Sequence, residues 1–144
     1  MYLYQPRAGK WYLAGPMSGR PQFNIPQFDK VAAELRTYGW DMVSPAELDD
    51  PEYRATCLAS DGTSYPPGGP TWADLLARDV KLVADGVAGL ILLPDWKYSR
   101  GAKLEVFVAL TCNKDFFEYR PVATEKLYPV SRDWVRYILG ENLP

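Results

Sequence analysis

The chain has 144 residues, of which 47% are hydrophobic and 24% charged, and these values predict one globular domain with its own core. Its formal net charge of -2 leaves no electrostatic case for long nucleic acid or an anionic membrane as a partner. Histidine is absent, which excludes the Ser-His and Cys-His nucleophile systems and removes the commonest zinc ligand.

The first part of the chain predicts a β-strand, an α-helix and a second strand. The expected strands are Lys10–Ala14 and Trp40–Val43, and apolar residues recur at helical spacing within Gln27–Tyr38. A strand, a helix and a strand within about thirty residues form a βαβ unit. Such a unit implies a parallel sheet.

Residues 46–70 are rich in aspartate, proline and glycine, which predicts a long loop with one short helix near Glu52–Leu58. Loops of this length inside a compact domain are often lids or binding loops. A tolerated surface insertion is the alternative interpretation.

Helices and strands alternate again in the second half of the chain. The expected elements are a helix over Trp72–Ala84 capped by Thr71, a strand over Val87–Leu93, a helix over Gly101–Thr111, an edge strand over Phe116–Val122 and a helix over Ser131–Leu139. The order predicts a single α/β domain over residues 1–144, built as a three-layer sandwich with a parallel, flavodoxin-like or Rossmann-like sheet.

The two cysteines, Cys57 and Cys112, are far apart in the sequence and are expected to be reduced thiols. No segment approaches the ~18 apolar residues of a membrane helix. The N-terminal segment lacks the apolar core of a signal peptide. We therefore expect a cytoplasmic protein with no membrane partner.

Three clusters carry residues with chemical potential. The segment Tyr12–Gly19 follows the first strand with small residues that let a ligand approach the backbone, although an ordinary tight turn explains it equally well. Asp79 lies beside the apolar face of its helix, where a solvated surface aspartate is the simpler interpretation. The third cluster holds Ser99 and Gly101 at a helix N-terminus, followed one turn later by Glu105.

Glu105 is the least expected of these residues because it interrupts an otherwise apolar helix. An unpaired buried carboxylate costs several kcal/mol, roughly, so it usually has a use. An ion pair with Lys103 or Arg100 is the structural alternative. Two carboxylates, an anion pocket and no histidine suit glycosidic chemistry, in which one carboxylate attacks the anomeric carbon and the other handles the proton of the leaving group.

These motifs resemble the nucleoside 2-deoxyribosyltransferase superfamily, which includes 2'-deoxynucleoside 5'-phosphate N-hydrolases and phage-encoded relatives. The resemblance covers roughly residues 10–112, in the expected order. The matching motifs are YLAGPMSG at 12–19, ARDV at 77–80, GLILLPD at 89–95 and SRGAKLE at 99–105.

The resemblance implies a role for each matched position. Glu105 corresponds to the nucleophile that attacks C1' of the sugar, and Asp79 to the residue that assists protonation of the departing base. Ser99 and Gly101 correspond to the phosphate-holding loop. The remaining substrate-binding positions implied by the motifs are Tyr12, Gly15, Met17, Ser18 and Gly19.

The chain also departs from the family pattern. Asp95 stands where the transferases carry an acid-rich loop. The 46–70 segment has no alignable counterpart. This segment and Trp96 could select the base by stacking, and a structural role for the tryptophan is the equal alternative. By resemblance, the extension 116–144 reaches a neighbouring subunit, so a homo-oligomer is expected.

The sequence thus predicts an N-glycosidase that cleaves the base–sugar bond of a nucleoside or deoxynucleoside 5'-monophosphate, with a small-molecule partner and neither metal nor organic cofactor. Transfer of the sugar to a second base is one alternative. A non-catalytic nucleotide-binding or sensing protein on the same fold is another, and a structural domain is the third.

Overall fold

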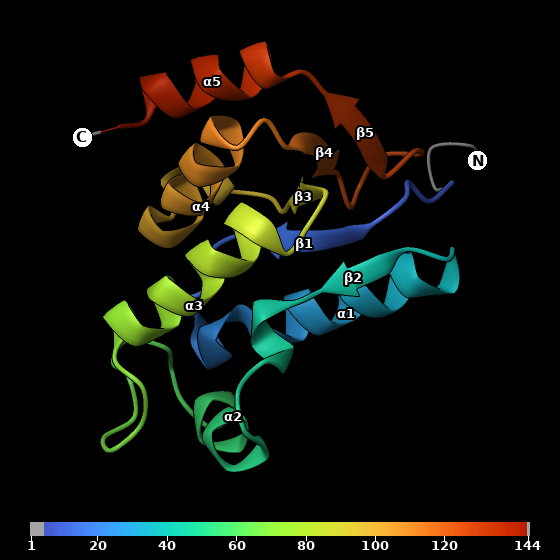
Figure 1. The fold of residues 1–144 in the computed structure, drawn as a ribbon. Coiled ribbons are helices and arrows are strands. Elements are labelled where there is room, and N and C mark those ends of the chain that lie inside the picture. The colour runs from blue at the N-terminus through green and yellow to red at the C-terminus, as the bar shows by residue number, and fades with distance from the viewer. Residues whose placement is uncertain (1–4, 144) are drawn as a thin grey trace.

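A five-stranded sheet forms the centre of the molecule, with helices on both of its faces (Figure 1). The computed structural model describes residues 5–143. The strand order is β2-β1-β3-β4-β5, and all neighbouring pairs are parallel except β4 and β5. This arrangement confirms the predicted three-layer α/β sandwich and adds one antiparallel strand to it.

The predicted βαβ unit is confirmed. β1 spans Lys10–Ala14, α1 spans Ile25–Thr37 and β2 spans Asp41–Val43. Between β1 and α1, three consecutive residues have left-handed backbone: φ is 59° at Gln22, 52° at Phe23 and 58° at Asn24. Such conformations cost energy in residues other than glycine. This turn therefore requires support from its surroundings.

The middle of the chain also follows the prediction. The short helix α2 spans Pro51–Leu58 inside the 46–70 segment. α3 spans Trp72–Asp85, and Thr71 caps it in a reciprocal capping box with Asp74. β3 spans Gly89–Leu92 and is buried throughout, and α4 spans Arg100–Thr111.

The strand predicted over Phe116–Val122 exists, but the prediction that it lies at the edge of the sheet was wrong. β4 spans Asp115–Tyr119 and pairs with β3 on one side and with β5, Leu127–Val130, on the other. β5 was not predicted because Pro129 interrupts it, and proline is tolerated within strands mainly at sheet edges. α5 spans Arg132–Glu141 and is capped by Ser131, as expected.

Alternate residues of the strands enter two separate cores. Trp11, Leu13 and Ile91 pack with α1 and α2 on one face of the sheet. On the other face, Leu90 and Leu92 pack with residues of α3, α4 and α5. The period of two along the strands thus builds the three layers. From β1 the chain first adds β2 on one side of it, and then continues with β3 on the other side. The direction in which strands are added therefore reverses between β1 and β3, and this is the topological switch point of the sheet.

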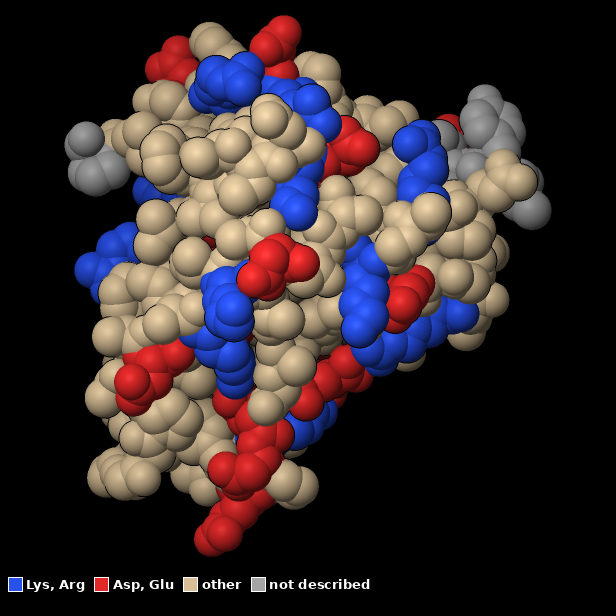
Figure 2. All heavy atoms as spheres, in the orientation of Figure 1, with Lys and Arg blue, Asp and Glu red and all other residues tan. Residues whose placement is uncertain are grey.

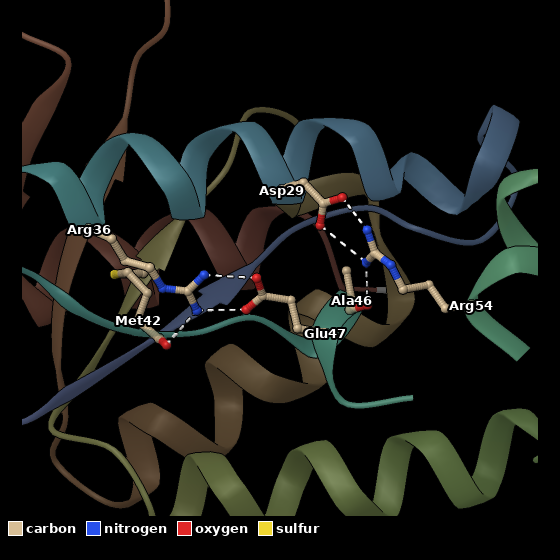
Figure 3. A network of polar contacts seen from close by, with 6 residues as sticks. All are labelled: Asp29, Arg36, Met42, Ala46, Glu47 and Arg54. Atoms are coloured by element: carbon tan, nitrogen blue, oxygen red, sulfur yellow. Dashed lines mark hydrogen bonds and ion pairs between the residues drawn. The ribbon is translucent and has the colours of Figure 1, made fainter. Parts of the chain in front are cut away.

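Two arginines fix the start of the 46–70 segment against α1 (Figure 3). Arg36 on α1 donates to both carboxylate oxygens of Glu47, at 2.8 and 2.6 Å, and to the carbonyl of Met42 at 3.0 Å. Arg54 on α2 pairs with Asp29 on α1 and donates to the Ala46 carbonyl at 2.8 Å. The segment is therefore anchored from its first residues.

Basic and acidic side chains alternate across the face of the molecule in Figure 2, and no continuous basic surface forms there. This mixed pattern agrees with the near-neutral net charge and gives a nucleic-acid backbone no extended stripe to follow. Within residues 5–143, no helix combines the length and apolar character that a membrane crossing requires.

Candidate active site

A cavity of about 550 Å³ opens at the carboxyl ends of β1 and β3, beside the switch point where ligands bind in open α/β sheets. Its walls come from the loop after β1, the 46–70 segment, α3, the loop after β3 and the start of α4. The lining includes Gly15, Met17, Ser18, Gly19, Arg20, Asp49, Tyr53, Tyr65, Trp72, Arg78, Asp79, Asp95, Tyr98, Ser99, Arg100, Gly101 and Glu105.

Glu105 lies on α4 at the floor of this cavity, with only 7% of its surface exposed. The hydroxyl of Tyr12, a completely buried residue on β1, donates a hydrogen bond to Glu105 Oε2 at 2.7 Å. Burial, and next the negative charge of Asp79, raise the pKa of Glu105 to about 8. Lys103 instead donates to the Asn142 carbonyl at 2.8 Å, so the alternative interpretation of Glu105 as the ion-pair partner of Lys103 was wrong.

Asp79 lies on α3 and is also buried, with 8% of its surface exposed. Arg78 Nε donates to Asp79 Oδ1 at 2.9 Å. Burial raises the pKa of Asp79, whereas the Arg78 guanidinium and a hydrogen bond with Tyr12 oppose that rise. The interpretation of Asp79 as a solvated surface residue was wrong, because the side chain faces the cavity.

Both carboxyl groups line the same cavity, the negative charge of Asp79 acts on Glu105, and Tyr12 is hydrogen-bonded to both groups. Two close, buried carboxyl groups do not ionise together easily, so the pair retains one proton at neutral pH. Burial raises the pKa of Tyr12 well above its ordinary value, which keeps its phenol protonated. The site therefore holds one carboxylate, one carboxylic acid and a phenol that contacts both.

The start of α4 forms a second part of the site. Ser99 Oγ accepts from the Ala102 amide at 3.2 Å and thereby caps the helix. The amides of Arg100 and Gly101, between Ser99 and Ala102, also belong to the first turn, where amides have no acceptor within the helix. A Cβ atom added at Gly101 would meet nothing within 4 Å, so protein packing does not require a glycine there. The bare backbone leaves room for an anion to approach these amides.

Sequence comparison places the chain in a family. The profile of DUF4406, described as a domain of unknown function, matches residues 9–117. The chain belongs to the DUF4406 family. Neither curated proteins nor solved structures match it significantly. The DUF4406 match includes both buried carboxyl groups and ends within β4.

Most of the predicted site residues meet in this DUF4406 chain, but two lie elsewhere. Tyr12 is absent from the cavity lining and reaches the site only through the carboxyl groups. Trp96 is buried on the α5 side of the sheet and lines a different hollow with Trp134, so it is not positioned to stack on a base beside Glu105. Trp96 follows the buried strand β3, and its position in the sequence alone does not define on which face of the sheet its side chain packs.

The structure also adds residues that sequence reasoning missed in the DUF4406 domain. Tyr65 and Trp72 bring aromatic rings to the cavity, and the Arg100 guanidinium lies 4.7 Å from the centre of the Trp72 ring. Asp95 lines the cavity as predicted, but it pairs with Arg20 at 2.9 Å. The two aromatic residues within 65–72 were the only sequence signal from which this part of the cavity lining could have been predicted.

The 46–70 segment of the DUF4406 domain forms a wall of the cavity. The Gly19 amide donates to the Gly62 carbonyl at 2.8 Å, and the Gln22 amide donates to the Ser60 carbonyl at 2.9 Å. The hydroxyls of Ser18 and Tyr65 are hydrogen-bonded to each other. These contacts favour the binding-loop interpretation over that of a surface insertion. Within residues 5–143, no group of three or more His, Cys, Asp or Glu side chains is arranged to hold a metal ion.

Proposed function

We propose that this protein cleaves the N-glycosidic bond of a nucleoside or deoxynucleoside 5'-monophosphate. The observation that carries the proposal is the pair of buried carboxyl groups, Glu105 and Asp79, which line one cavity at the switch point of the sheet. The motif resemblance to nucleoside 2-deoxyribosyltransferases supports the same assignment.

In this reaction Glu105 is the nucleophile. A Glu105 oxygen attacks the anomeric carbon while the bond to the base breaks, and the electron pair of that bond passes to the base nitrogen. Asp79 gives its proton to that nitrogen. Water then displaces Glu105 from the sugar, with Asp79 accepting the proton from the water.

The single proton of the carboxyl pair must lie on Asp79 when the bond breaks. In the free protein, burial favours the protonated form of Glu105. Positive charge develops at the anomeric carbon in the transition state, and this charge stabilises an ionised Glu105. The transition state, rather than the free protein, therefore favours the arrangement of the proton that the reaction needs.

The cavity lining offers partners for both the phosphate and the base of a nucleotide. The amides at the start of α4 and the nearby Arg100 are donors for a phosphate. Tyr65 and Trp72 offer rings on which a base can stack. No additional cofactor is needed in this scheme, because the carboxyl pair supplies both the nucleophile and the acid.

A panel of nucleosides and their 5'-monophosphates, assayed for release of free base, tests the proposal. We expect base release, with monophosphates reacting faster than nucleosides because only they can use the α4 amides. Sugar transfer to an added second base would identify a transferase. Ligand-induced stabilisation without turnover would instead indicate a binding protein. Light scattering on the same preparation tests the expected homo-oligomer.

Gly101→Ala is expected to lower kcat/KM for monophosphates while the fold is retained. The added methyl group meets no protein atom within 4 Å but narrows the approach to the α4 amides. Alanine is also a better helix former, by up to about 1 kcal/mol.

The matched control for this variant is Gly140→Ala on α5, where an added Cβ likewise meets nothing within 4 Å. Both variants should melt at or above the parental temperature, and only Gly101→Ala should lose activity on monophosphates. Unchanged kinetics in Gly101→Ala would contradict a phosphate site at this helix.

A further inference from the structure

Arg78 is shared between two carboxylates from different parts of the chain. Its Nε donates to Asp79 Oδ1 at 2.9 Å, and its Nη1 donates to Asp49 Oδ1 at 2.7 Å. Nη2 also lies 3.4 Å from the carbonyl of Pro45. Both carboxylate side chains are largely buried, at 13% exposure for Asp49 and 12% for Asp79. The single positive charge of Arg78 is thus shared by two carboxylates that have little contact with solvent.

Contacts of the neighbouring residues on both sides hold Asp49 in this position. It follows Glu47 by two residues, and Glu47 is bound by both arms of the Arg36 guanidinium (Figure 3). Asp49 is followed by Asp50, whose side chain accepts from the Tyr53 amide at 2.9 Å and so caps α2. With both flanks fixed, Asp49 has little freedom to leave Arg78.

We propose that Asp49 is a positioning residue that divides the charge of Arg78 with Asp79 and so couples the 46–70 segment to the acid of the reaction. The proposal rests on the proposed function, because it assigns Asp49 an effect on the protonation of Asp79. Asp49 itself does not need to touch the reacting atoms.

The physical basis is competition for one positive charge. An arginine devoted to Asp79 alone would hold that group ionised and make it a poor proton donor. Asp49 draws part of this stabilisation away and adds a negative charge of its own, which raises the pKa of Asp79. The charged and titratable groups around Asp79 are Tyr12 on β1, Asp49 and Tyr65 from the 46–70 segment, Arg78 on α3 and Glu105 on α4.

Asp49→Asn tests this role. The amide still fits the site but leaves the charge of Arg78 to Asp79, so the pKa of Asp79 should fall. Less of the shared proton then lies on Asp79, so the plateau of kcat/KM should fall. In the free protein the proton of the pair lies on Glu105, so Asp79 is the group that titrates on the acidic limb of the pH–kcat/KM profile, and this limb should move to lower pH. A purely structural defect would lower the plateau without moving the limb.

Arg78→Gln should shift the acidic limb in the opposite direction, to higher pH, because loss of the Arg78 cation raises the pKa of Asp79. Glu52→Gln is the matched control, since this exposed acid in the same segment does not line the cavity. Melting temperatures show whether each variant is folded.

A direct titration of Asp79 by carboxyl ¹³C NMR, in the parent and in Asp49→Asn, needs no turnover. An unchanged Asp79 pKa, or an unmoved limb in an active Asp49→Asn, would overturn the role of Asp49. Absence of base release from the parent on every substrate would instead overturn the proposed function, while the NMR titration would still decide the charge sharing.

Discussion

Glu105→Gln is expected to abolish base release and, at the same time, to stabilise the folded protein above pH 7. Loss of the nucleophile should lower kcat by at least about a thousandfold, since the amide cannot form the glycosyl intermediate. The gain in stability has a separate cause, which is the burial of Glu105.

The sign of the stability change follows from proton linkage. The pKa of Glu105 is raised from its ordinary value of 4.5 to about 8 in the folded protein. Between these values the folded state holds a proton that the unfolded state has released. The free energy of unfolding therefore falls as pH rises through this window, by up to about 1.4 kcal/mol for each pH unit, and levels off above about pH 8. Glutamine has no such proton, so the variant should lack this loss.

Denaturant unfolding at pH 5, 6.5 and 8 measures the effect, beside base release from the preferred monophosphate. Glu141→Gln, at the exposed end of α5, is a suitable control because its side chain is solvated in both states. Base release at the parental rate by Glu105→Gln would remove it as nucleophile. An identical pH dependence of unfolding in parent and variant would show that Glu105 titrates normally.

Gly62→Ala is expected to detach the 46–70 segment from the loop after β1. Gly62 has φ of +81°, and an added Cβ would lie 1.7 Å from the backbone oxygen of Arg20. The backbone conformation alone costs about 1–2 kcal/mol for alanine. The overlap with a backbone atom adds to this, since no flexible side chain can move away. Activity should fall with stability, because the segment lines the cavity.

Gly68→Ala separates these two contributions. Gly68 has a similar φ of +79°, but nothing lies within 4 Å of its added Cβ. Its variant should lose only the conformational energy and keep most of its activity. Equal loss of stability in the two variants would show that the contact at Gly62 is easily relieved, and full activity in Gly62→Ala would show that docking of the segment is dispensable.

Local patterns were sufficient for most of the fold. The apolar spacing of α1, the capping of α3 by Thr71 and the buried run of β3 are all encoded within neighbouring residues. β5 was missed because Pro129 disguises it, and its stability comes from pairing with β4 rather than from its own residues. With β5 missed, β4 was taken as the edge.

The site was predictable where burial conflicted with residue type. Glu105 was identified because a carboxylate within an apolar helix calls for an explanation, whereas Asp79 was assigned its role through the motif resemblance, and both line the cavity. The place of Trp96 was not predicted correctly, because the face of the sheet on which a side chain packs after a strand depends on how all the layers are arranged. Asp49 was missed because its link to Asp79 is an arginine contact across 29 residues of sequence.

The left-handed turn at Gln22–Asn24 depends on contacts with a distant part of the chain. Gln22 is bound on both sides by the 46–70 segment: its amide donates to Ser60 and its side chain to the Leu58 carbonyl at 2.9 Å. Without these bonds the turn would relax toward right-handed backbone. We therefore expect the loop after β1 and the 46–70 segment to open together as one local unit, which native-state hydrogen exchange would show. Opening of this unit is expected to open the cavity as well, because both the loop and the segment line it.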